Sequence, residues 1–333
     1  MKYIKLFEDF SDKVLDNLED IKWIIVSFCD DRISYKILSN YEDKLVIYSL
    51  SGEQTNKEEF ESLEGRIKDL NPNYEYIIIE DKIAIGLPEY LKIFKIIEMY
   101  KIENYTFNDD GSIDVNGDVS LYYSGLTKIP IVFRNVTGDF DCCDNKLTSL
   151  EGCPKTVGGD FYCYDNNNLT SLLGSPKKVG GNFNCSSNNI TSLEGSPETV
   201  GGDFDCSNNK LTSLEGCTKT VGGDFYCNSN KLTSLEGSPK KLGGDFSCTF
   251  NKLKSLEGCP KTIGGDFNCR DNNLTSLEGC PETVGGDFNC SANELTSLKG
   301  CPKTVGGHFS CSCNYLTSLE GIGDVKGKIF SDL

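Results

Sequence analysis

The chain has 333 residues, with 33 Lys and Arg against 50 Asp and Glu, a formal net charge of −17, 17 cysteines and one histidine. Nucleic acids and anionic lipids attract surfaces rich in Lys and Arg, so this acidic chain is expected to bind neither nucleic acid nor membrane. Its 38% of hydrophobic residues is enough for a buried core and argues against global disorder.

Residues 1–108 contain no internal repeat and are predicted to form a small α+β domain. Apolar periodicity predicts three helices, near Phe7–Ile21, Lys57–Leu70 and Glu89–Lys101. Alternating apolar residues predict short strands paired as hairpins, at Ile33–Leu38, Leu45–Leu50, Tyr74–Ile79 and Ile83–Ile85. The apolar run Ile21–Cys29 is too short for a signal peptide or a bilayer span, so we expect a cytoplasmic chain.

The segment Asn108–Ser112 reads as a turn and separates the first domain from a second, residues 109–333. In the second domain phenylalanine recurs every 21 residues with one step of 22, at Phe140, Phe161, Phe183, Phe204, Phe225, Phe246, Phe267, Phe288 and Phe309. The repeating unit is V-G-G-D-F-x-C-x-x-N-x-L-T-S-L-E-G-C-P-K-T. The extra residue is assigned between Cys163 and Asn167, which makes Asn167 the asparagine of its unit. Degenerate units at about 113–132 and 322–333 are expected to cap the array.

The Val, Phe and Cys of each unit have the same parity, so in a single strand all three would point into one core. Stacked coils would place parallel strands about 4.8 Å apart, with a spine of Phe rings and Asn side chains bonded to turn backbone. The remainder, T-S-L-E-G-C-P-K-T, is too short and too rich in Gly and Pro for a regular helix. The predicted fold is an α+β domain followed by a parallel β-sheet solenoid of 21-residue coils without regular convex helices.

The unit resembles a leucine-rich repeat in which Phe and Cys replace the strand leucines. Together with the opening Met1–Phe10 and the link Asp110–Val115, it resembles leucine-rich-repeat proteins found in tailed-bacteriophage genomes. The resemblance implies a leucine-rich-repeat solenoid that binds protein, located in the host cytoplasm or the virion, and it supplies no catalytic residue. The opening also resembles phage capsid-targeting peptides that are cleaved after Leu-x-Glu, here Leu6–Glu8, an ordinary helix start being the alternative.

Candidate binding residues are the outward-facing positions of the coils. The position before each Phe holds seven carboxylates, Asp139, Asp160, Asp203, Asp224, Asp245, Asp266 and Asp287. Neighbours about 4.8 Å apart repel by roughly 0.9 kcal/mol in water, so this column indicates a basic partner or cations. The alternative is that each Asp accepts hydrogen bonds from the Gly-Gly turn before it. Further outward positions carry possible interface anchors, Tyr162, Tyr164, Tyr226 and Arg270, although exposed tyrosines are also ordinary on strands.

The cysteines are expected to be free thiols that act as small core hydrophobes in a reducing compartment. Stacked equivalents would lie at the strand spacing, beyond the roughly 3.8 Å between Cβ atoms that a disulfide prefers. Cys142–Cys143 and Cys311–Cys313 lack the spacing of a zinc site, so no metal is expected. His308 has no nucleophile beside it, and the Gly-Gly pairs lack a P-loop Lys-Ser/Thr, so neither enzyme activity nor a cofactor is expected.

These features predict a non-enzymatic recognition scaffold that binds a partner protein, with a basic surface, on the concave face of the solenoid. One alternative is a structural or packaged component of a phage virion, in which the solenoid is a rigid spacer. Another is a cation- or glycan-binding adhesin, which the free-thiol pattern disfavours.

Overall fold

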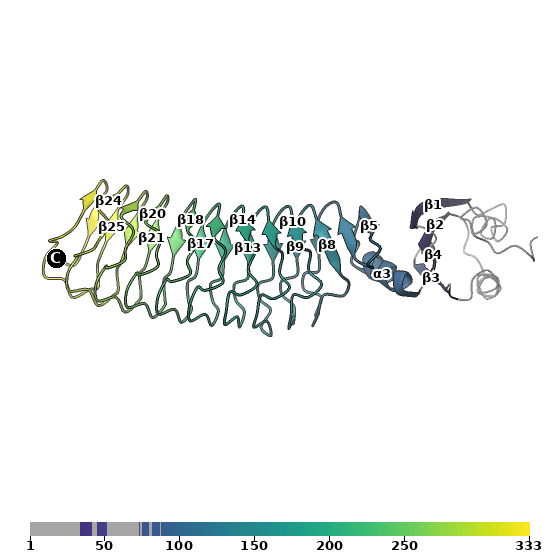
Figure 1. The fold of residues 1–333 in the computed structure, drawn as a ribbon, viewed down its shortest axis with the longest axis horizontal. Helices are drawn as coiled ribbons and strands as arrows, with labels where there is room; N and C mark the ends of the chain where they lie inside the picture. Colours follow the sequence, from purple (N-terminus) through teal and green to yellow (C-terminus); the bar gives the residue numbers. More distant parts are fainter. Residues whose placement is uncertain (1–33, 42–44, 52–72, 74, 80–81, 87) are drawn as a thin grey trace, which may run out of the picture. The chain divides into compact units, whose positions relative to one another are not determined.

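The computed structural model describes residues 34–41, 45–51, 73, 75–79, 82–86 and 88–333 (Figure 1). The chain divides into two compact units, Met1–Lys101 with Asp109–Gly111, and Ile102–Asn108 with Ser112–Leu333. The predicted helices Phe7–Ile21 and Lys57–Leu70, the run Ile21–Cys29 and the cleavage motif Leu6–Glu8 lie outside the described residues.

The first unit contains an antiparallel sheet of order β1-β2-β4-β3. Its strands fall where the sequence predicted them, at β1 Ser34–Tyr41, β2 Leu45–Ser51, β3 Glu75–Ile79 and β4 Lys82–Gly86. The predicted third helix is confirmed as α3, Pro88–Met99. Pro88 suits the first helical position, and Leu91, Phe94 and Ile97 form a buried stripe spaced by three residues.

The second unit is a solenoid in which each coil contributes two short strands to two kinds of parallel sheet, drawn as two rows in Figure 1. The strands that carry the repeat valine form what we call the valine sheets. The first valine sheet comprises β6 Ile113–Val115, β8 Phe133–Val136, β10 Thr156–Val157, β12 Lys178–Val179, β14 Thr199–Val200, β16 Thr220–Val221 and β18 Lys241–Leu242, with β5 Tyr105–Phe107 antiparallel at its edge. The second comprises β20 Thr262–Ile263, β22 Thr283–Val284, β24 Thr304–Val305 and β26 Asp324–Val325.

The strands that carry the repeat phenylalanine form one continuous sheet, which we call the phenylalanine sheet. It comprises β7 Val119–Ser120, β9 Phe140–Asp141, β11 Phe161–Tyr162, β13 Phe183–Asn184, β15 Phe204–Asp205, β17 Phe225–Tyr226, β19 Phe246–Ser247, β21 Phe267–Asn268, β23 Phe288–Asn289, β25 Phe309–Ser310 and β27 Ile329–Phe330. The register pairs each phenylalanine with the next, as in Phe204 with Phe225. The degenerate units continue that register, with Val119 opposite Phe140 and Ile329 opposite Phe309.

The prediction of one strand running from Val to Cys is wrong, because the Gly-Gly pair interrupts it. A Cβ on Gly158 would lie 2.1 Å from the carbonyl oxygen of Thr137, and one on Gly159 would lie 2.1 Å from Oδ1 of Asp139. Only glycine allows the coils to approach this closely where the chain passes from one sheet to the other. The valine and phenylalanine side chains nevertheless share one core, since Val157 and Phe161 are both buried.

The core is a continuous column of phenylalanine rings. All nine repeat phenylalanines are 0% exposed, and neighbouring ring centroids from Phe140 onward lie between 5.0 and 5.8 Å apart. Cysteine and leucine fill the layer beside them, as Cys206, Leu211 and Leu214 show at 0% exposure. Parallel in-register stacking brings these rings within the 4.5–7 Å range in which aromatic pairs attract, at about 0.5–1.5 kcal/mol each beyond area burial.

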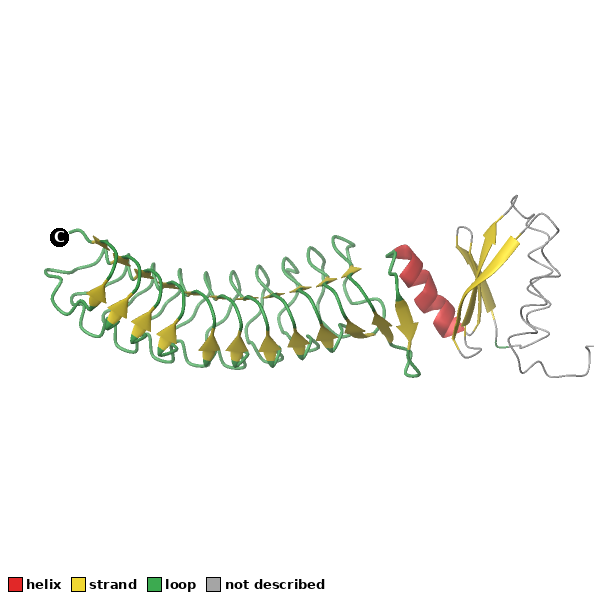
Figure 2. Cartoon of the chain, turned by 90° about the horizontal axis from the view of Figure 1, so that it is seen from above, coloured by secondary structure: helices red, strands yellow, loops and turns green. Residues whose placement is uncertain are grey.

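A second column, of buried asparagines, closes the turn after the cysteine. Asn209 Nδ2 donates to the carbonyls of Cys185, Cys206 and Ser207, and its Oδ1 accepts from the N–H of Ile190 at 3.0 Å. This satisfies turn backbone that the short strands leave unpaired, as the sequence predicted. From Ile102 to Leu333 the coils contain no helix, which confirms the prediction for the convex side (Figure 2).

The long coil corrects one assignment. Asn166, not Asn167, is the asparagine of its unit, since it is 0% exposed and its Nδ2 donates to Cys142, Cys163 and Tyr164 carbonyls. The extra residue therefore follows the asparagine instead of preceding it. Asn188 Oδ1 therefore accepts from the N–H of Asn166 at 2.8 Å, whereas the equivalent oxygen in other coils accepts from the N–H of an aliphatic residue such as Ile190.

Candidate functional site

The seven predicted aspartates stand directly before the phenylalanine strands, after a Gly-Gly pair or, at Asp139, after Thr137-Gly138. Each one accepts a hydrogen bond through Oδ1 from the backbone N–H of the equivalent residue in the next coil, at 2.6–2.8 Å. The donor is the following coil, not the turn before the aspartate, so that alternative is wrong in its detail. We call these seven residues the aspartate ladder, and Asp118 in the first coil makes the same contact with the N–H of Asp139.

Two natural replacements show what the aspartate ladder requires. Asn182 Oδ1 accepts from the N–H of Asp203 at 2.7 Å, and His308 Nδ1 accepts from the N–H of Lys328 at 2.9 Å. Neither side chain has to be negative to do so, because the ladder position needs only a hydrogen-bond acceptor. The negative charge on the seven aspartates therefore exceeds what the backbone contact demands.

The surface around the aspartate ladder is strongly acidic. We define the phenylalanine face as the residues before and after each Phe and the residue after each Cys, from Asp118 to Ser312. Besides the ladder it contains Asp118, Asp141 and Asp205, and its only Lys or Arg is Arg270. The lysines of these coils lie at other positions, among them Lys146, Lys155, Lys177, Lys210, Lys219, Lys231, Lys240, Lys252 and Lys261.

Within the described part of the chain, none of the seven aspartates forms an ion pair. The ion pairs found there are Arg134–Asp114, Lys261–Glu282, Arg270–Asp271, Lys303–Glu282 and Lys326–Asp324. The charges on the phenylalanine face are thus available to an external cation.

Two predicted tyrosines are bonded to the aspartate ladder. The hydroxyl of Tyr162 donates to Oδ2 of Asp160 at 2.5 Å, and that of Tyr226 donates to Oδ2 of Asp224 at 2.7 Å. The hydrogen bond to Asp160 and partial burial raise the pKa of Tyr162 to about 12, and the same causes raise the pKa of Tyr226. The structure joins each tyrosine to an aspartate that the sequence treated as a separate candidate.

Tyr164 lies in a cluster that the sequence did not predict. Its hydroxyl contacts the buried thiol of Cys143, and that thiol donates to Oδ1 of Asp141 at 2.8 Å. Tyr122 occupies the equivalent position in the first coil, and the charge of Asp144 is the chief cause that raises its pKa. The sequence offered one indication for Tyr122, an aromatic residue in the degenerate first unit at a position where the repeat does not require one. The structure shows that this side chain is exposed.

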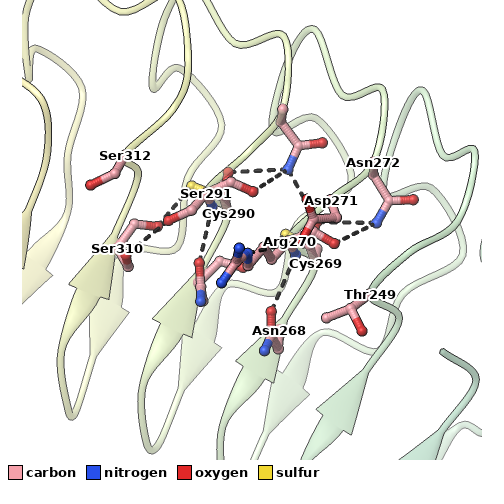
Figure 3. Close-up of polar contacts among 12 residues, drawn as sticks. Thr249, Asn268, Cys269, Arg270, Asp271, Asn272, Cys290, Ser291, Ser310 and Ser312 are labelled. Atoms are coloured by element: carbon pink, nitrogen blue, oxygen red, sulfur yellow. Dashed lines mark hydrogen bonds and ion pairs between the residues drawn. The ribbon is translucent and has the colours of Figure 1, made fainter. Parts of the chain in front are cut away.

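Arg270 lies five coils after Tyr162 on the same face, so the structure does not bring them together. Its Nε is 2.9 Å from Oδ2 of Asp271, and its backbone N–H donates to Asn268 Oδ1 at 3.2 Å. The neighbouring coil adds a hydrogen bond between the hydroxyls of Ser291 and Ser310, 2.8 Å apart (Figure 3). The guanidinium is thus held by its own coil at the edge of the acidic surface.

The described cysteines form no disulfide. Burial raises the pKa of the Cys206 and Cys227 thiols, and each of the two donates weakly to a carbonyl of the next coil, at 3.4 Å in both cases. These are the properties of packing groups, not of nucleophiles. Over the described ranges, no three or more His, Cys, Asp or Glu side chains are grouped so that they could hold a metal ion.

No family model, no curated protein and no solved structure matches the chain. In the portion of the chain that the structure describes, no helix has both the length and the apolar character needed to cross a bilayer.

Proposed function

We propose that this protein is a non-enzymatic recognition scaffold whose phenylalanine face binds a partner protein with a basic surface. The observation that carries the proposal is the contrast between Asn182 and its neighbours in the aspartate ladder. Asn182 makes the same backbone contact without charge, at 2.7 Å against 2.6–2.8 Å for the aspartates. Seven charges that the fold does not need, collected on one face and paired with no Lys or Arg of the described residues, favour a positively charged partner.

The proposal includes the finer identity that the repeat suggests. The unit G-G-D-F-x-C-x-x-N-x-L-T-S-L-E-G-C-P supports a leucine-rich-repeat protein of a tailed bacteriophage, acting in the host cytoplasm. The binding surface is the outer side of the phenylalanine sheet, which takes the place of the single concave sheet that the sequence predicted. Tyr162, Tyr164 and Tyr226 would supply contact area, and Arg270 would limit the acidic surface near one end.

The test is capture of binding proteins from host lysate by the full chain and by two variants of equal charge. In the first variant the seven ladder aspartates become asparagine, the residue already present at position 182. In the second, seven exposed glutamates elsewhere on the coils become glutamine, namely Glu151, Glu194, Glu215, Glu236, Glu257, Glu278 and Glu320. Both changes add seven units of charge, so only their position differs.

The proposal expects the wild type and the glutamine variant to capture the same basic protein, and the asparagine variant to lose it. Equal capture by all three would show that the phenylalanine face is not the binding surface. Mass spectrometry of purified virions tests the alternative of a structural or packaged virion component. A recognition protein that acts in the cytoplasm should be absent from the virions.

A further inference from the structure

Four tyrosines gather on the first three coils, and we call them the tyrosine cluster: Tyr122, Tyr123, Tyr162 and Tyr164. Backbone bonds from Tyr123 to Cys143 (3.3 Å) and from Asp144 to Tyr164 (3.1 Å) place Tyr122, Cys143 and Tyr164 at the same position of successive coils. Tyr122 and Tyr164 are therefore two strand spacings apart, about 9.6 Å, with the buried Cys143 between them.

The rings form two contacting pairs with much open surface. The ring centroids of Tyr122 and Tyr123 lie 5.9 Å apart, and those of Tyr162 and Tyr164 lie 6.2 Å apart. Tyr122 is 52% exposed and Tyr123 is 76% exposed, so their faces are open to a ligand. Tyr226, three coils further on, has no such ring contact within the described residues.

Carboxylates surround these rings. Asp141 accepts from the N–H and the thiol of Cys143, while Asp144 and Asp165 follow in the next turn positions of the second and third coils. Burial and then the charge of Asp144 raise the pKa of Asp165, which shows that the two carboxylates repel each other. None of the three is ion-paired with any Lys or Arg that the structure describes.

Ring faces beside uncompensated carboxylates match the chemistry of one side chain best. A guanidinium stacks on an aromatic ring through its flat face and donates hydrogen bonds in its plane to carboxylates. A lysine ammonium is more strongly hydrated and gains less from the rings, and a neutral sugar would leave the carboxylates uncompensated.

We propose that the tyrosine cluster, with Asp141 and Asp144, binds arginine side chains of the basic partner protein and anchors it at the first three coils. The inference rests on the proposed function, and it specifies arginine as the basic side chain that the partner contributes. The aspartate ladder then attracts the partner over a longer range and does not discriminate between lysine and arginine.

The experiment measures fluorescence anisotropy of three labelled peptides on the full chain at low salt. The peptides alternate glycine with arginine, with lysine, or with citrulline, which has the shape of arginine without its charge. Tyr122→Leu removes a ring and keeps apolar bulk, and Asp144→Asn removes a charge. Tyr315→Leu, at an exposed tyrosine outside the phenylalanine face in a distant coil, is the matched control.

The arginine peptide should bind several-fold more tightly than the lysine peptide, and the citrulline peptide should not bind. Tyr122→Leu should weaken the arginine peptide about two- to fivefold, the size of an exposed cation–π contact, with little effect on the lysine peptide. Asp144→Asn should weaken both, and Tyr315→Leu should change neither.

Equal binding of arginine and lysine peptides, unchanged by Tyr122→Leu, would overturn the inference. The proposed function would still stand if the seven-asparagine variant lost both peptides. No binding of either cationic peptide to the wild type would overturn both proposals. Binding of a neutral oligosaccharide that Tyr122→Leu abolishes, in place of the arginine peptide, would also overturn the inference and point to a glycan ligand.

Discussion

Asp203 accepts a hydrogen bond through Oδ1 from the backbone N–H of Asp224, 2.8 Å away in the next coil. Asp224 in turn accepts from Asp245 at 2.7 Å, so each carboxylate is held by the coil that follows it. The contact orients one oxygen toward the solenoid. In Asp224 the second oxygen receives the hydroxyl of Tyr226. The two oxygens of Asp224 thus have separate partners, a backbone N–H of the next coil and a tyrosine hydroxyl of its own coil.

Replacing the seven ladder aspartates with asparagine should leave the solenoid folded and raise its thermal stability at low salt. The backbone contacts survive, as Asn182 shows, and the repulsion of roughly 0.9 kcal/mol between water-exposed neighbours is removed. Thermal unfolding should show the gain shrinking as salt increases, because salt screens the same repulsion. A large loss of stability at every salt concentration would mean that the charge is structural.

Asn209→Ala should lower the free energy of unfolding by about 3 kcal/mol or more. The change strands the buried carbonyls of Cys185, Cys206 and Ser207 and the N–H of Ile190, and each buried unsatisfied group costs about 1–3 kcal/mol. Lys210→Ala, next to it but exposed, is the control and should cost less than about 0.5 kcal/mol. Urea denaturation of both variants compares them, and equal midpoints would contradict the structural role of the asparagine column.

Gly243→Ala should destabilise the solenoid far more than Gly264→Ala. A Cβ on Gly243 would lie 1.9 Å from the carbonyl oxygen of Gly222, whereas one on Gly264 would lie 3.0 Å from that of Gly243. The difference arises because the valine sheets are interrupted between β18 and β20. We expect a loss of about 3 kcal/mol for the first and less than about 1 kcal/mol for the second, measured by urea denaturation. Equal losses would show that the coils approach equally closely at both positions, which would contradict the prediction.

Tyr162 should ionise only in strongly alkaline solution. Its neutral hydroxyl donates to Asp160, so its pKa is raised to about 12 in the folded protein against about 10 in the unfolded chain. The stabilisation from this bond is present below about pH 10 and is lost as the pH rises through 12. Phenolate absorbance of wild type minus Tyr162→Phe should show this titration, and Asp160→Asn should move it to lower pH. A difference curve centred near pH 10 would contradict the contact.

Periodicity in the sequence was sufficient to predict the stacking of coils. Phenylalanine every 21 residues allows only one register for the core, and even Val119 and Ile329 in the predicted degenerate units keep that register. The choice between Asn166 and Asn167 was not decided in this way, since both are asparagines beside a one-residue insertion. Only the bonds of Asn166 to three carbonyls resolve it.

The candidate site shows the same division. The sequence alone identified the aspartate column, Tyr162, Tyr164, Tyr226 and Arg270, because residue type and parity reveal what faces outward. It did not reveal that Gly158 and Gly159 lie where the chain passes between two sheets, or that Asp139 accepts a hydrogen bond from the N–H of Asp160. Nor did it reveal that Tyr122, Cys143 and Tyr164 occupy the same position in three successive coils. Those facts depend on contacts between coils 21 or 22 residues apart. A linear pattern specifies which side chains repeat, whereas the atoms they meet are decided by how closely neighbouring backbones approach.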